Sequence, residues 1–72
     1  MDLIEHESEE QLSREEAAKR LHALADSLER HNEVTFDQGG IKHTVKVPKE
    51  VTLAVEVEVG DEGGEIEVEL RW

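Results

Sequence analysis

The histidines are the residues of this chain best suited to metal binding or acid–base chemistry at neutral pH, because the sequence contains no cysteine. His6 and His43 fall on the inward-facing parity of two expected strands, so the fold could bring them together. A zinc site takes three or four protein ligands, however, and the sequence shows no third ligand for this pair. His22 and Asp26 lie four residues apart on one helix face, but the HExxH pattern is missing. We therefore expect no metal and no cofactor.

The carboxylates do not form a recognisable catalytic pattern either. A pair such as Glu56 and Glu69 would need two environments that push the two pKa values apart inside a cleft, whereas an exposed row of glutamates gives every member nearly the same environment. The segment "DEGGE" (61–65) lacks the ligand spacing of a calcium loop, and no glycine-rich phosphate-binding motif is present. A chain of 72 residues has little length to enclose a pocket of about 300 Å³. We predict that the protein is not an enzyme.

The composition is strongly acidic, with 19 Asp and Glu against 8 Lys and Arg and a formal net charge of −11. This charge repels nucleic-acid phosphate and anionic membrane surfaces, so neither is an expected partner. No run of about 18 apolar residues and no signal-peptide pattern is present. The absence of cysteine suits a reducing compartment. We expect a cytoplasmic protein with a single small domain over residues 1–72.

Residues 13–31 carry the pattern of one amphipathic helix. Ser13 and Glu16 have the spacing of a capping box, and Asn32 is a plausible left-handed stop after the last turn. The apolar residues recur at helical spacing and form one stripe, which consists of Ala17, Leu21, Leu24 and Leu28.

After residue 32 the apolar residues alternate with polar ones, which predicts four half-buried strands. Glycine-containing turns at 37–40 and 60–65 and a short connection at 48–50 separate them. Upstream of the helix, Ile4, His6 and Ser8 alternate with glutamates and suggest a further strand. The predicted fold is therefore α+β in the order β-α-β-β-β-β, with the helix packed on one face of a mainly antiparallel sheet that ends in a β-meander.

The last two strands raise an electrostatic problem. If Val59 faces Ile66, like charges oppose each other at two positions, Glu58 with Glu67 and Glu56 with Glu69. We expect Lys42 of the preceding strand to relieve part of this repulsion. Concentrated salt, bound divalent cations or a basic partner protein could supply the rest, and we favour concentrated salt.

Three segments resemble the amphi-Trp domain family of small archaeal and bacterial domains. They are "SREEA" (13–17) at the helix start, "ADSL" (25–28) near its end, and the final strand that closes on Trp72. The resemblance extends over essentially the whole chain, although His6 stands where the family more often has an aromatic residue. It implies the fold described above and adds no mechanism, because the family has no assigned activity.

Two functional hypotheses follow. The first is a small acidic protein-interaction module adapted to high salt, which binds a protein partner or a second copy of itself as a homodimer. The alternative is an acidic regulator or nucleic-acid mimic that binds a basic protein surface. The predicted interaction residues are Trp72, an aromatic anchor of the kind enriched at binding hot spots, and Glu56, Glu58, Glu67 and Glu69.

Overall fold

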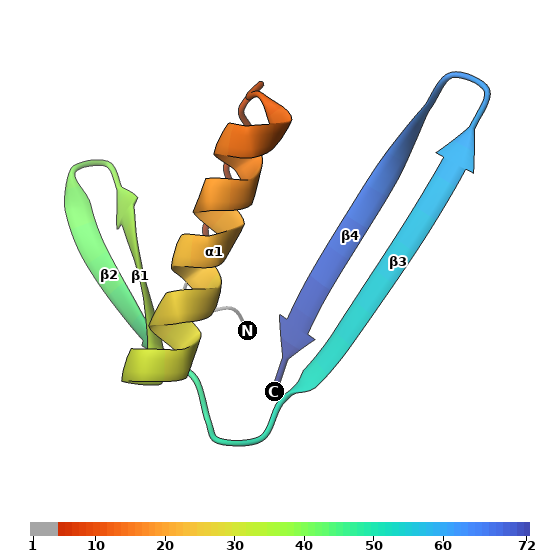
Figure 1. The fold of residues 1–72 in the computed structure, drawn as a ribbon. Helices are drawn as coiled ribbons and strands as arrows, with labels where there is room; N and C mark the ends of the chain where they lie inside the picture. Colours follow the sequence, from red (N-terminus) through yellow and green to blue (C-terminus); the bar gives the residue numbers. More distant parts are fainter. Residues whose placement is uncertain (1–4) are drawn as a thin grey trace.

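The structure, a computed structural model, describes residues 5–72 as one helix followed by four strands (Figure 1). The predicted α+β class is confirmed. The elements are α1 Arg14–His31, β1 Glu33–Gln38, β2 Ile41–Lys46, β3 Thr52–Gly60 and β4 Gly63–Arg71.

The helix begins and ends where local chemistry predicts. The hydroxyl oxygen of Ser13 accepts a hydrogen bond from the backbone N–H of Glu16 at 3.1 Å, which satisfies one of the free amides of the first turn. At the other end Asn32 adopts a left-handed conformation with φ 54°, and Arg30 forms an ion pair with Asp26 at 2.9 Å. The boundaries of α1 are therefore encoded by its caps.

The strands form two separate antiparallel hairpins, β1–β2 and β3–β4, among the residues that the structure describes. The prediction of one continuous sheet with a meander is wrong, because β2 and β3 do not pair. The backbone N–H of Val47 donates to the carbonyl oxygen of Asn32 at 2.8 Å, which ties the end of β2 to the end of α1. The connection then passes through Pro48, which has no N–H to offer a neighbouring strand.

The predicted first strand is also wrong at His6 and Ser8, because residues 5–13 have no strand structure, while Ile4 lies outside the described residues. This segment is held by side chains instead. Glu10 accepts a hydrogen bond from Arg20 of α1 at 2.8 Å, and the ring of His6 stacks on Phe36 of β1 with centroids 4.5 Å apart.

The β1–β2 hairpin turns at Gly39 and Gly40, whose φ values of 62° and 81° suit glycine best. One of its faces carries opposite charges across the strands, because Glu33 pairs with Lys46 and Asp37 pairs with Lys42. The sequence predicted that Lys42 would lie beside Glu56 on a neighbouring strand. This prediction is wrong, because Lys42 pairs with Asp37 and β2 does not pair with β3. The other face contains the cross-strand pairs Val34 with Val45 and Phe36 with His43.

The β3–β4 hairpin has a tighter turn than expected. Its ladder continues to Gly60 and Gly63, so only Asp61 and Glu62 form the turn, and Val57 rather than Val59 lies opposite Ile66. The predicted register is thus wrong by two residues. A slip of two keeps each side chain on the same face, which is why alternation alone could not detect it.

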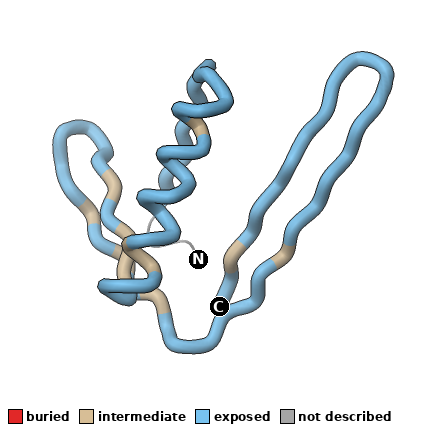
Figure 2. Tube along the Cα trace, in the orientation of Figure 1, coloured by how far each residue is buried: buried red, intermediate tan, exposed pale blue. Residues whose placement is uncertain are grey.

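Packing in this chain is shallow. Figure 2 shows the partly buried residues gathered mainly where the end of α1 meets β1–β2, and none of residues 5–72 is fully buried. α1 packs against β1 and makes no packing contact with β3–β4, which projects away from the rest of the chain (Figure 1). The expected packing of the helix over the C-terminal strands is therefore not observed.

Candidate functional site

One face of the β3–β4 hairpin is entirely apolar over most of its length. Valine and isoleucine side chains alternate with glutamates on both strands, so the antiparallel register gathers them on one side. Val57 remains 64% exposed and its neighbour across the ladder, Ile66, 71% exposed. We call this surface the apolar face; it consists of Leu53, Val55, Val57, Val59, Ile66, Val68 and Leu70.

The opposite side of the same hairpin is a row of carboxylates. Glu56 lies directly across from Glu67 and Glu58 across from Glu65, so two pairs of like charges face each other. We call this surface the glutamate face; it consists of Glu56, Glu58, Glu65, Glu67 and Glu69. Four of its members are predicted interaction residues, and Glu65 is the member that the incorrect register left out.

The crowding of carboxylates perturbs the titration of one of them. The pKa of Glu67 is raised above its usual value, first by a side-chain hydrogen bond with Glu65, then by the negative charge of Glu65, with smaller effects of desolvation and of Glu69. The charge compensation that the structure gives to Glu69 is an ion pair with Arg71 on the same strand. The hairpin from 52 to 71 thus holds seven carboxylates and one arginine, which is more than half of the net charge of the chain.

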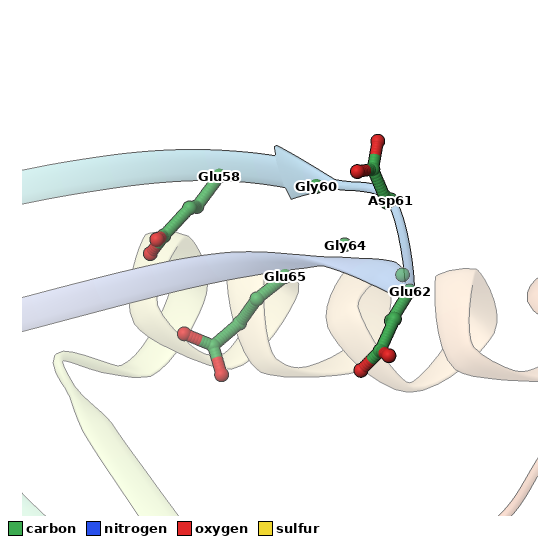
Figure 3. A pocket seen from close by; sticks show the side chains of 7 residues that line it. Glu58, Gly60, Asp61, Glu62, Gly64 and Glu65 are labelled. Carbon is green, nitrogen blue, oxygen red and sulfur yellow. The ribbon is translucent and has the colours of Figure 1, made fainter.

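The tip of the hairpin is a shallow hollow bordered by glycines and carboxylates (Figure 3). Figure 3 shows the side chains of Asp61 and Glu62 pointing to opposite sides of the turn, while Glu58 and Glu65 lie further along the strands. Within residues 5–72 no group of three or more His, Asp or Glu side chains is placed to hold a metal ion. The tip is therefore a polar turn, with carboxylates that do not converge.

The two histidines that the sequence analysis singled out both contact one aromatic ring. His43, the cross-strand neighbour of Phe36, stacks on that ring with centroids 5.4 Å apart, and His6 stacks on it at 4.5 Å. This role of Phe36 was not predicted from the sequence. Its position opposite His43 could have been found by pairing the strands about the two glycines at 39 and 40.

Trp72 follows β4 at the open end of the hairpin, where the ladder ends with the pair Thr52 and Arg71. Its side chain is 62% exposed. By its place in the alternation, Trp72 follows Ile66, Val68 and Leu70 on the side of the apolar face, at the base of the hairpin. Most of its surface is available for contact.

No helix in the part of the chain that the structure describes is long and apolar enough to cross a membrane. What the geometry offers is one extended surface: a two-stranded sheet that is apolar on one side and acidic on the other, with a tryptophan at its base. An exposed apolar surface of this kind has the features of a binding surface.

The chain belongs to the Amphi-Trp domain family, whose model matches residues 2–72. The resemblance noted in the sequence is thereby confirmed over essentially the whole chain. Comparisons with curated proteins and with solved structures found no match.

Proposed function

We propose that this chain is a non-enzymatic, cytoplasmic protein-interaction module that uses the apolar face of β3–β4 to bind another protein chain in a high-salt cell. The observation that carries the proposal is the exposure of this face in a molecule in which no described residue is fully buried. Exposed contiguous apolar patches of more than a few hundred Å² generally mark interaction sites. The exposed indole of Trp72 at the base of the face suits an anchor residue.

The high-salt part of the proposal is supported by the glutamate face. Like charges oppose each other at Glu56–Glu67 and at Glu58–Glu65, which destabilises a hairpin in dilute buffer. Salt shortens the range of this repulsion from about 10 Å at 0.1 M to about 3 Å at 1 M. Because both faces belong to the same strands, screening of the glutamate face also maintains the apolar face.

A second candidate is favoured by the same carboxylates. A row of five glutamates spaced along two strands could bind a basic protein surface as an acidic regulator or nucleic-acid mimic, and the positive charges of such a partner would relieve the repulsion that raises the pKa of Glu67. In this case the glutamate face is the binding surface.

Two neighbouring residues on β3 separate these candidates. Val57→Lys places a charge in the apolar face, and Glu58→Lys reverses a charge on the glutamate face of the same strand. The tagged chain and each variant are expressed in cells together with a differently tagged wild-type copy. The captured proteins are identified by mass spectrometry at high salt and again at moderate salt, at which a complex held by opposite charges persists. The proposal predicts that Val57→Lys loses a captured protein that Glu58→Lys retains.

The reverse pattern, with loss in Glu58→Lys only and a basic captured protein, would support the acidic regulator instead. A set of captured proteins that neither variant changes would contradict both candidates. The copy of the chain itself is scored separately from all other captured proteins.

A further inference from the structure

The chain exposes far more surface than a folded monomer of its size. It has 7013 Å² of accessible surface and a mass of 8.2 kDa, for which a compact monomer exposes about 4,500 Å². Its radius of gyration is 14.1 Å, compared with about 11 Å for a compact domain of this length. The excess surface of about 2,500 Å² per chain corresponds to about 5,000 Å² per pair, within the range of obligate homodimers.

Two apolar surfaces of the same chain contribute to this excess. The first is the apolar face of β3–β4. The second is the stripe on α1, where Leu21 is 59% and Leu24 is 44% exposed. These surfaces do not touch each other within the chain, since α1 makes no packing contact with either strand of the hairpin.

The two surfaces match in length. α1 has 18 residues and is about 27 Å long, and β3 and β4 have nine residues each and are about 30 Å long. A helix laid along the hairpin would place the exposed Leu21 and Leu24 against its apolar face, while the end of α1 at Leu28 is already partly buried beside β1. A helix with one apolar stripe on a sheet with one apolar face is a standard two-layer arrangement.

This inference rests on the proposed function: we propose that α1 of a second copy of the chain covers the apolar face. In a two-fold dimer each helix covers the hairpin of its partner, so both apolar surfaces of both chains are buried in two identical contacts. A packing of hairpin on hairpin would leave Leu21 and Leu24 exposed. No described residue of a single chain is fully buried, so the chain needs a partner to form a buried core. A second copy is available wherever the chain itself is present.

The glutamate faces lie on the outer side of such a dimer. They do not enter the contact between helix and hairpin, because they occupy the opposite side of the strands. The net charge of −11 on each chain nevertheless opposes association over long range. The dimer is therefore expected to be tighter at about 2 M KCl than at about 0.1 M.

Sedimentation of the purified full chain at high salt tests the pairing, with two variants that each damage one surface. Leu24→Lys alters the helix stripe and Val57→Lys alters the apolar face, while Glu58→Lys serves as the matched control on the outer face. The wild type and the control are expected to be dimers. Each of the other two variants alone has no intact contact, so we expect its dissociation constant to rise by at least about thirtyfold.

Mixing the two damaged variants gives the decisive result. A mixed dimer contains one intact contact, formed by the helix of the Val57→Lys chain and the hairpin of the Leu24→Lys chain. We expect this mixture to associate more tightly than either variant alone and less tightly than the wild type. Since the readout is rescue on mixing, it remains valid when a variant is unfolded alone.

Three results would overturn the inference: a monomeric wild type at every concentration, a dimeric Leu24→Lys chain, or a mixture without rescue. None of them decides the proposed function, because an apolar face that a second copy does not cover can still be covered by a different protein, whose loss in Val57→Lys the capture experiment scores. Conversely, a homodimer with the predicted rescue would stand even if no other protein were captured.

Discussion

At the scale of single residues, the two hairpins differ in the charges that face each other across their strands. β1–β2 pairs Glu33 with Lys46 and Asp37 with Lys42, whereas β3–β4 places Glu56 against Glu67. The first arrangement stabilises a hairpin most in dilute salt, whereas the second depends on screening or on a partner. The glutamate face is thus the part of the chain whose stability should respond most to salt and pH.

The raised pKa of Glu67 fixes the direction of the pH response. A carboxyl group with a higher pKa in the folded hairpin than in the unfolded chain binds its proton more tightly when folded, so its contribution to stability is full at low pH and is lost as pH rises through the raised pKa. We expect the Glu67→Gln variant to be more stable than the wild type at neutral pH in dilute salt, and this advantage to disappear on acidification. Thermal melts of both chains across pH measure the difference.

Glu10 provides the opposite control. Its pKa is lowered by a hydrogen bond from Arg20 and by the positive charge of that residue, so its contribution is present above the ordinary pKa and lost as pH falls through the lowered one. Glu10→Gln should therefore be less stable than the wild type at neutral pH and converge with it in acid. Identical pH profiles for the two variants would contradict both assignments.

The cap of α1 gives a further prediction at this scale. Ser13→Ala removes the oxygen that accepts the hydrogen bond from the N–H of Glu16, which should lower the free energy of unfolding by about 1 kcal/mol. Ser8→Ala, in the irregular segment before the helix, is the control. Urea melts at high salt measure both, and an equal effect of the two changes would show that the cap does not stabilise the helix.

At the scale of elements, the sequence predicts the helix and the four strands after it well because capping and alternation are local signals, but the alternation around His6 wrongly predicts a further strand. The N-cap of α1 at Ser13, its C-cap at Asn32 and the two-sided character of β3–β4 all follow from neighbouring residues. The register of β3–β4 and the failure of β2 to pair with β3 were not predictable in this way. A slip of two residues preserves every face, and strand pairing depends on contacts distant in sequence.

The turn of β3–β4 can be tested through its two glycines. Gly63 has φ 146°, a conformation that side chains rarely adopt, whereas Gly60 has an ordinary φ and no close neighbour for an added methyl group. Gly63→Ala should lower the free energy of unfolding by about 1–3 kcal/mol, and Gly60→Ala should change it little. Urea melts of the two variants compare them directly. A larger loss in Gly60→Ala would contradict the two-residue turn.

At the scale of the whole molecule, the candidate surface was only partly visible in the sequence. Trp72 and four of the five glutamates were identified from their spacing, because parity places them correctly whatever the register. The exposure of the apolar face was not foreseen, since the same alternation is equally consistent with a helix packed over it. The decisive fact is spatial: α1 and β3–β4 belong to one chain and do not touch.

This arrangement makes stability depend on concentration as well as on salt. If folding is completed by a second chain, the thermal midpoint of the pure protein should rise over about a hundredfold range of chain concentrations, and should be higher at about 2 M KCl than at about 0.1 M. Tryptophan fluorescence of Trp72 reports the transition. A midpoint independent of concentration would indicate a monomer that is stable alone.

The central claim is that the apolar face of β3–β4 is covered by another protein chain, and the most direct measurement is the solvent accessibility of its methyl groups. A chain labelled at Val57 and Ile66 is examined by NMR at high salt with a soluble paramagnetic probe, first alone and then in native cell extract. We expect the two methyl signals to be protected from broadening, already in the pure protein if the partner is a second copy, or only in extract if it is a different protein. Full broadening of both signals under both conditions would contradict the claim.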